Sequence, residues 1–281
     1  MIGNANRRTT LLQTFQMIRI LFLLFLSSFI TMMHAQTSQV MPLWPDSVPL
    51  STLPKADAEG KLDTRDHVYR INQVSDPKLF KINPETSSNN KAILVCPGGG
   101  YQLLAYNLEG TEIAEWFTNL GFTAYVLQYR VPNNPEGALL DARRALELIR
   151  KDASYSQVGM IGFSAGAHLT MHTAATDTSA YRPNFNMLIY PAYMDRGENH
   201  TLSPELSLGK HVGPSFIFQT MDDPYGNSAL VLAQALRAQQ ISTELHMLQR
   251  GGHGYGLRKG NEAGEEWPIL AEQWLMQLFS K

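Results

Sequence analysis

A serine between two glycines is the feature of this sequence that most directly suggests chemistry. Ser164 lies in Gly162-Phe163-Ser164-Ala165-Gly166, after the apolar run VGMI and before the helix-forming stretch AHLTMHTAA. At an abrupt strand-to-helix turn the flanking positions are too crowded for side chains, and the serine hydroxyl is pushed out at the edge of the sheet. Two interpretations follow. Ser164 is a nucleophile, or it caps the next helix, as serine often does.

A serine nucleophile needs a histidine base, and that histidine needs an acid to fix its tautomer. After a serine on this kind of turn, the order along the chain is Ser, then Asp or Glu, then His. Asp222 and Asp223 follow the apolar run SFIFQT, and His253 follows the run TELHML in a glycine-rich loop. Either aspartate suits the acid, and the other would hydrogen-bond the turn or start the next helix.

The remaining histidines suit the base less well. His168 lies on the helix after Ser164, where it packs in the core or faces the substrate. His246 lies within an expected strand, and His200 and His211 fall in a loop. Because no H-E-x-x-H or clustered His/Asp spacing occurs, we expect neither a metal nor a cofactor.

A glycine loop upstream offers donors for a developing negative charge. The run AILVC leads into Pro97-Gly98-Gly99-Gly100-Tyr101, where backbone N–H groups are accessible. Such donors stabilise the oxyanion of a tetrahedral intermediate by about 2.7–4 kcal/mol each. The alternatives are a flexible turn or a phosphate loop, although no Lys-Ser/Thr pair follows the glycines as a phosphate loop requires.

The elements that must position these residues are apolar runs separated by helical stretches. We expect strands at 92–96, 122–129, 158–163, 186–193, 215–220 and 243–248. Strands this apolar are usually covered on both faces by crossover helices, which predicts an α/β domain with a mainly parallel sheet. Two alternating runs before them, His67–Ile71 and Lys78–Ile82, predict a half-exposed antiparallel pair at the sheet edge.

The helical stretches have apolar stripes. In GALLDARRALELIRKDA the stripe consists of Leu139, Ala142, Ala145 and Ile149. The opposite face is expected to meet solvent and consists of Asp141, Arg144, Glu147 and Lys151. The stretches NSALVLAQALRAQQ and EEWPILAEQWLMQLF repeat the pattern. From Gln36 to about Ala58 the sequence shows neither the period of a strand nor that of a helix. We therefore expect this lead-in segment to pack on the surface through Trp44.

Composition and the first residues set the class of protein. The 281 residues are 44% hydrophobic with a net charge of -2, which excludes a disordered, collagen-like or charge-driven nucleic-acid-binding chain. Residues 1–35 carry only arginine charges, an apolar run shorter than the roughly 20 residues of a membrane span, and a cleavage site after Ala35. They predict a signal peptide, or an uncleaved anchor as the alternative, with Met17 as a second start. The remaining residues, 36–281, predict one periplasmic or secreted domain, and its lone Cys96 excludes an intramolecular disulfide.

From about Lys91 to the end, the chain resembles the α/β-hydrolase family of serine esterases, in particular exported bacterial acetyl xylan esterases and xylanase-associated esterases. The resemblance rests on CPGGGYQLLAYNLEGTEIAEWFTNLGFTAYVLQYRVP, DARRALELIR, IGFSAGAHL, DDPYGNSALVLAQAL and GGHGYGL. It implies an α/β-hydrolase fold with antiparallel edge strands at the N-terminal side and no large lid domain. It also implies Ser164 as nucleophile, Asp223 as acid and His253 as base.

The resemblance further implies the N–H groups of Gly99, Gly100 and Ala165 as oxyanion donors. The chain departs from many relatives at Pro97, where they carry the histidine of His-Gly-Gly-Gly. Glu109 also resembles the subgroup and would face the substrate or brace the oxyanion loop. The alternative is an acid at the start of a helix.

Substrate-binding residues are expected among side chains near the sheet edge. His168 and Glu109 are two of these, and the loop at 194–212 is the insertion that could shape the pocket. The tyrosines that could stack on sugar rings, or could simply pack in the core, are Tyr101, Tyr106, Tyr193 and Tyr255.

The resemblance implies hydrolysis of short acyl esters on an acylated carbohydrate, foremost acetyl groups on plant polysaccharide such as xylan. A feruloyl or general short-chain carboxylesterase is the alternative, followed by a serine peptidase and a non-catalytic binding protein. We expect no nucleic-acid partner, and no membrane partner once the signal peptide is removed.

Overall fold

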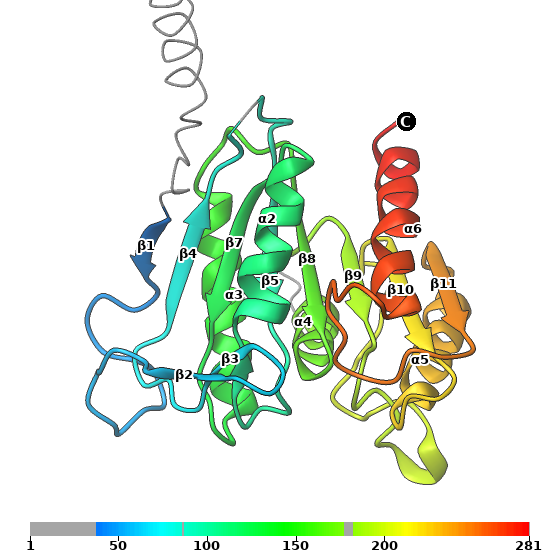
Figure 1. Cartoon of the computed structure of the whole chain (residues 1–281), viewed down its shortest axis with the longest axis horizontal. Coiled ribbons are helices and arrows are strands. Elements are labelled where there is room, and N and C mark those ends of the chain that lie inside the picture. Colours follow the sequence, from blue (N-terminus) through cyan, green and yellow to red (C-terminus); the bar gives the residue numbers. More distant parts are fainter. Residues whose placement is uncertain (1–37, 86, 177–181, 281) are drawn as a thin grey trace, which may run out of the picture. The chain divides into compact units, whose positions relative to one another are not determined.

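The computed structural model describes residues 38–85, 87–176 and 182–280, and the expected signal peptide lies outside them. From Ser38 onward the chain forms one compact unit around an eight-stranded sheet (Figure 1). In spatial order the strands are β1 (Gln39–Pro42), β4 (Lys78–Ile82), β7 (Thr123–Gln128), β5 (Lys91–Cys96), β8 (Gln157–Phe163), β9 (Asn186–Ile189), β10 (Ser215–Thr220) and β11 (Thr243–Leu248). Among the described residues, no helix is long and apolar enough to cross a membrane.

The six strands from β7 to β11 run parallel, as their apolar sequences predict. β4 is antiparallel to both of its neighbours, β1 and β7. The expected strand at 186–193 ends early, at Ile189, because the backbone turns at Tyr190 with φ of 38°. The mainly parallel α/β sheet with antiparallel strands at its N-terminal side is confirmed.

Helices cover both faces of the sheet (Figure 1). α2 (Glu112–Asn119) and α6 (Glu262–Phe279) pack on one face. α3 (Pro135–Arg150), α4 (Ala165–Thr176) and α5 (Gly226–Ala238) pack on the other. A parallel sheet needs such crossover helices, because its strands cannot be joined by tight turns.

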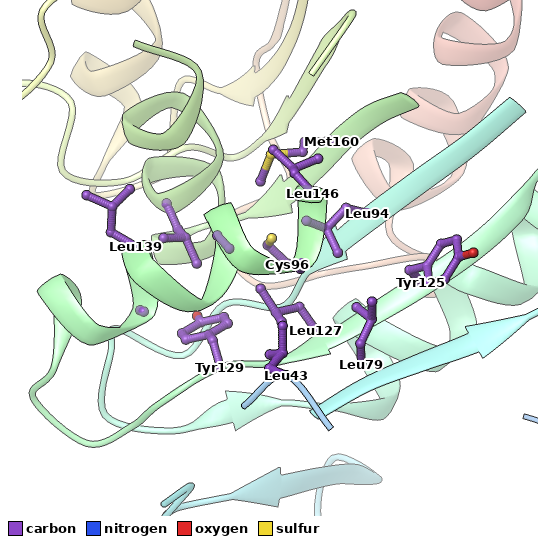
Figure 2. Packing of buried hydrophobic residues seen from close by; sticks show 14 of the residues in the cluster. Leu43, Leu79, Leu94, Cys96, Tyr125, Leu127, Tyr129, Leu139, Leu146 and Met160 are labelled. Atoms are coloured by element: carbon purple, nitrogen blue, oxygen red, sulfur yellow. The ribbon is translucent and has the colours of Figure 1, made fainter. Parts of the chain in front are cut away.

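β5 explains why the central strands are apolar at every position. Ile93 and Val95 join the buried cluster on the α2 and α6 face, whereas Leu94 and Cys96 join the cluster under α3. Successive side chains of a strand point to opposite faces, and here both faces are covered. Figure 2 shows Leu94 and Cys96 packed near Leu146 of α3. Burial of each such Leu, Ile or Val side chain stabilises the fold by about 1.5–3 kcal/mol.

A second, small sheet lies outside the main one and consists of β2 (Gly60–Asp63), β3 (Val68–Ile71) and β6 (Leu104–Ala105). The expected pairing of His67–Ile71 with Lys78–Ile82 is therefore wrong. β3 pairs with β2 and β6, while β4 pairs with β1 and β7 inside the main sheet. Alternation indicates a half-buried strand, but it does not encode which strand lies beside it.

The expectation that Asp141 faces solvent is also wrong. Its side chain is fully buried and pairs with the buried Arg130, with 2.8 Å between Arg130 Nε and Asp141 Oδ2. Trp44 Nε1 donates to the second carboxylate oxygen at 2.8 Å. A helical wheel places Asp141 on the polar face, whereas the cation of Arg130, which lies just after β7, makes its burial possible. On the same face, Glu147 and Lys151 are partly exposed, as expected, and form an ion pair at 3.3 Å.

The lead-in segment packs against the domain through Trp44, as expected, and also contributes structure that its sequence does not reveal. Residues 39–42 form β1, and Leu43 is fully buried. The segment shows no period because only four residues pair, too few for alternation to be visible.

Candidate active site

The turn between β8 and α4 holds Ser164 in a left-handed conformation with φ of 53°. Both flanking glycines are required by close contact. A methyl group on Gly162 would lie 2.1 Å from the carbonyl oxygen of Gly166, and one on Gly166 would lie 2.1 Å from the carbonyl oxygen of Cys96. A left-handed serine costs about 1–3 kcal/mol, so the surrounding packing holds the turn in a strained state.

Ser164, His253 and Asp223 form one hydrogen-bonded chain. The distance between Ser164 Oγ and His253 Nε2 is 2.7 Å, and that between His253 Nδ1 and Asp223 Oδ2 is also 2.7 Å. Because a carboxylate only accepts, Nδ1 carries the proton and Nε2 is free to accept from the serine hydroxyl. The hydroxyl therefore points to a base, and no hydrogen bond joins it to the start of α4 in the described part of the chain.

Two adjacent aspartates hold the histidine loop in different ways. Asp223 is buried, and its Oδ1 accepts from the backbone N–H of Tyr225 at 2.7 Å. Asp222 accepts from the backbone N–H groups of Gly252 at 2.9 Å and of Gly251 at 3.3 Å. Asp222 thus fixes the loop backbone, whereas Asp223 orients the ring of His253. This is the turn-bonding role that the sequence left open for Asp222.

The glycine loop lies beside the serine and is fixed by a buried glutamate. Glu109 Oε2 accepts from the N–H of Gly98 at 2.7 Å, and its Oε1 accepts from the hydroxyl of Tyr190 at 2.8 Å. Burial raises the pKa of Glu109, and the two hydrogen bonds offset part of that rise. Glu109 lies in the π-helical turn η1 (Asn107–Thr111), which precedes α2, so it is an acid near the start of a helix. Its hydrogen bond from Gly98 also makes it a brace for the glycine loop.

The expected oxyanion donors, the N–H groups of Gly99, Gly100 and Ala165, belong to the glycine loop and to the residue directly after Ser164. The N–H groups of Gly99 and Gly100 make no hydrogen bond within the described residues. Ala165 begins α4, so its N–H has no partner inside the helix. Gly99, Gly100 and Ser164 line the same cavity.

A second chain of acid, histidine and hydroxyl lies behind the glycine loop. Glu205 Oε1 is 2.9 Å from His168 Nε2, and His168 Nδ1 is 2.9 Å from the hydroxyl of Tyr101. The hydrogen bond from His168 lowers the pKa of Glu205 to about 2. The carboxylate therefore accepts from Nε2, and Nδ1 accepts from Tyr101. This chain fixes Tyr101, the residue that follows the oxyanion loop.

The cavity over Ser164 has a volume of about 530 Å³ and an apolar side. Its apolar lining consists of Val68, Leu103, Ala105 and Leu108. Its polar and aromatic lining includes Asp66, Arg70, Glu109, Tyr193, Tyr225, His253 and Arg258. Sequence reasoning missed Arg70 and Arg258, because no motif connects residues of the small sheet and of the histidine loop to a site at the edge of the main sheet.

Of the residues expected to bind substrate, Glu109 and Tyr193 line this cavity, whereas Tyr106 does not. Tyr101, His168 and Tyr255 are buried behind its wall, so the expectation that they face the substrate is not met. Tyr101 and Tyr255 each follow a glycine of the site, and His168 lies on the helix after Ser164. Their closeness in sequence to the site is the reason for the expectation that they face the substrate. The residues of the described chain hold no cluster of three His, Cys, Asp or Glu side chains that could bind a metal ion.

Comparisons with known proteins agree with this fold. A family model described as the alpha/beta hydrolase fold matches residues 93–210. A crystal structure of an acetyl ester-xyloside bifunctional hydrolase from Caldicellulosiruptor lactoaceticus superposes with a TM-score of 0.66 at 26% identity, covering 85% of this chain and 96% of that one. An α/β hydrolase enzyme from a Medee basin deep-sea metagenome library gives a TM-score of 0.62 at 28% identity, with coverages of 73% and 93%. The chain has the α/β-hydrolase fold.

One relative gives a more particular likeness. Over 207 residues the chain is 29% identical to an acetylxylan esterase from Xylanibacter ruminicola. The match covers 62% of this chain but only 42% of that protein's length.

Proposed function

We propose that this protein is a serine esterase that removes short acyl groups, foremost acetyl, from a plant polysaccharide such as xylan. The observation that carries the proposal is the chain of hydrogen bonds from Asp223 through His253 to Ser164, with 2.7 Å at each step. The likeness to an acetylxylan esterase supports the choice of ester.

Acylation begins when Ser164 Oγ attacks the carbonyl carbon of the ester and His253 Nε2 takes the hydroxyl proton. The negative charge moves to the carbonyl oxygen, where the N–H groups of Gly99, Gly100 and Ala165 are available to stabilise it. The imidazolium, paired with Asp223, then gives its proton to the alcohol oxygen as the carbon–oxygen bond breaks. An acyl-serine and a free alcohol result.

Deacylation repeats these steps with water. Nε2 of His253 takes a proton from water as the water oxygen attacks the acyl carbon, and Ser164 Oγ leaves and recovers that proton. The carboxylic acid departs, and the enzyme returns to its starting state.

A feruloyl or general short-chain ester is the second candidate. The cavity volume of about 530 Å³ lies within the roughly 300–1,000 Å³ of small-molecule sites and exceeds what an acetyl group alone requires. Its apolar side would accept an aromatic acyl group as well.

The proposal is tested with three esters and one variant. The wild type should hydrolyse acetylated xylan faster than methyl ferulate, with p-nitrophenyl acetate as the reference. Ser164→Ala should lower turnover by roughly 10⁶-fold while leaving the fold intact, and should abolish labelling by a fluorophosphonate. Labelling of the variant, or near-wild-type turnover, would exclude Ser164 as nucleophile, whereas faster cleavage of methyl ferulate would favour the second candidate.

We further infer that the protein is exported, on the basis of its N-terminal sequence. N-terminal sequencing of the protein recovered from periplasm or medium should find Gln36 first. An unprocessed N-terminus in the cytoplasm would contradict export.

A further inference from the structure

A second cavity lies beside the catalytic one and shares two of its tyrosines. It has a volume of about 660 Å³ and is formed by the loop after β9 and the turn before α5. Tyr193 and Tyr225 line both cavities. A ligand that passes these two rings would therefore reach from Ser164 into the second cavity.

The lining of the second cavity combines aromatic rings with planar polar groups. The rings of Tyr193 and Tyr225 meet edge to face, with centroids 5.5 Å apart. The guanidinium of Arg196 lies 3.7 Å from the centroid of Tyr193, and Asn199 and His200 complete the polar lining. Arg196 covers one face of the Tyr193 ring, while the exposed ring of Tyr225 offers an apolar face, and the polar side chains offer hydrogen-bond donors and acceptors. A sugar ring presents the matching surfaces, a C–H face and a rim of hydroxyls.

The charges of this cavity favour a neutral ligand. Arg196 is accompanied by Asp195, whose carboxylate already accepts from Asn227 Nδ2 and Ser228 Oγ at 2.7 Å each. The two charges oppose each other, so an anion or a cation gains little here. An apolar acyl chain would remove water from Arg196 and Asn199 without replacing its hydrogen bonds. The acyl group therefore suits the catalytic cavity, with its apolar side, and the alcohol suits the second cavity.

The loop is held in place before any ligand arrives. Ser203 Oγ donates to the carbonyl of Tyr193 at 2.6 Å and accepts from the N–H of Arg196 at 2.9 Å. Asn199 and His200 are consecutive left-handed residues, with φ of 54° and 59°. Such conformations are uncommon outside glycine, and the strain is typical of functional loops.

We propose that the second cavity is a saccharide-binding site that holds sugar units next to the acylated unit, on the alcohol side of the ester. The inference rests on the proposed function, because it assumes that the ester at Ser164 has a carbohydrate alcohol. It adds that the enzyme distinguishes longer saccharides from shorter ones through Arg196 and the two tyrosines.

The test compares acetylated xylotetraose and acetylated xylobiose with p-nitrophenyl acetate. The wild type should show a higher kcat/KM on the tetraose than on the biose. In Arg196→Ala the ratio of kcat/KM on acetylated xylotetraose to that on p-nitrophenyl acetate should fall about 10-fold, the effect of losing one charge-assisted hydrogen bond. Arg237→Ala is the matched control, because it removes an exposed arginine of α5 that lines neither cavity.

Unacetylated xylotetraose tests the site without an ester. It should bind Ser164→Ala, measured by calorimetry, and bind at least several-fold more weakly when Arg196→Ala is added. Ester hydrolysis that ignores saccharide length and Arg196, with no binding of xylotetraose, would overturn the inference and leave the esterase proposal standing. Xylotetraose binding without hydrolysis of any ester would instead overturn the esterase proposal while supporting the saccharide site.

Discussion

Replacing Glu109 should damage both stability and turnover, because one buried carboxylate satisfies two groups at the site. Glu109→Ala removes the acceptors of the Gly98 N–H and the Tyr190 hydroxyl. Each buried group left without a partner costs about 1–3 kcal/mol. Glu109 lines the catalytic cavity, so water can enter the space. The free energy of unfolding should therefore fall by about 2 kcal/mol, near the lower end of the sum.

Glu109→Gln should cost about half as much. Its amide oxygen can still accept from Gly98, but its NH₂ faces Tyr190 Oη, which already accepts from the N–H of Gly256 at 3.1 Å. The glutamine NH₂ can donate to Tyr190 Oη, but the hydroxyl proton of Tyr190 then has no acceptor. One of the two donors is therefore left without a partner. Burial raises the folded-state pKa of Glu109, so its contribution is full below the unfolded value of 4.5 and is lost as pH rises through the raised pKa. The difference in stability between wild type and Glu109→Gln should therefore shrink as pH rises from about 4.5.

The assays are urea unfolding and kcat on p-nitrophenyl acetate. A loosened Gly98 displaces the neighbouring oxyanion donors, and loss of one donor lowers kcat by about 10²–10³-fold. Glu115→Ala, an exposed acid on α2, is the control and should change neither quantity. Wild-type stability and kcat in Glu109→Ala would refute the role of Glu109 as a brace.

Three further predictions concern the histidine loop, a buried histidine and the cysteine. Asp223→Asn should lower kcat by about 10⁴-fold. A crystal structure of the variant should show the loop of His253 in place, because Asp222 still holds the loop backbone. Near-wild-type kcat or a displaced loop would contradict this prediction. Burial lowers the pKa of His172 from 6.5 to about 4, so the unfolded chain protonates first and stability is lost as pH falls from 6.5 to 4. Between these two pH values, urea unfolding should show a smaller loss of unfolding free energy for His172→Gln than for the wild type. Equal losses in the two proteins would refute the assignment. Cys96 is fully buried, and burial raises its thiol pKa to about 12, so it should react with Ellman's reagent only after unfolding; rapid labelling of the native protein would contradict its burial.

The main sheet could be predicted because its strands are buried on both faces. Covered faces leave runs such as those of β5 and β8 with apolar side chains at every position, and crossover helices separate them. The partner of β3 could not be predicted, since pairing depends on where the chain returns in space. The burial of Asp141 could not be predicted for a similar reason, because its partner Arg130 lies outside the helix and leaves no mark on the helical period.

The candidate site likewise contains residues that the sequence predicts and residues that only the tertiary structure reveals. Ser164 and His253 could be proposed from sequence because a strand-to-helix turn and a glycine loop leave local patterns. Arg70 could not, because β3 reaches the cavity only through the tertiary fold, and Arg258 could not, because no motif marks it within the histidine loop. Tyr225 could have been found, since it lies two residues after Asp223 and its backbone binds that carboxylate.

The lead-in segment determines where the folding unit begins. The sequence motifs that resemble known enzymes start near Lys91, yet Trp44 and the carbonyl of Pro49 bind Asp141 and Arg130, whose ion pair lies in the core. A chain shortened to Lys91 would leave these buried charges partly uncovered and would remove the two antiparallel strands at one side of the main sheet. For expression, the smallest folding unit should therefore start at about Ser38, where the compact unit begins, and not at Lys91.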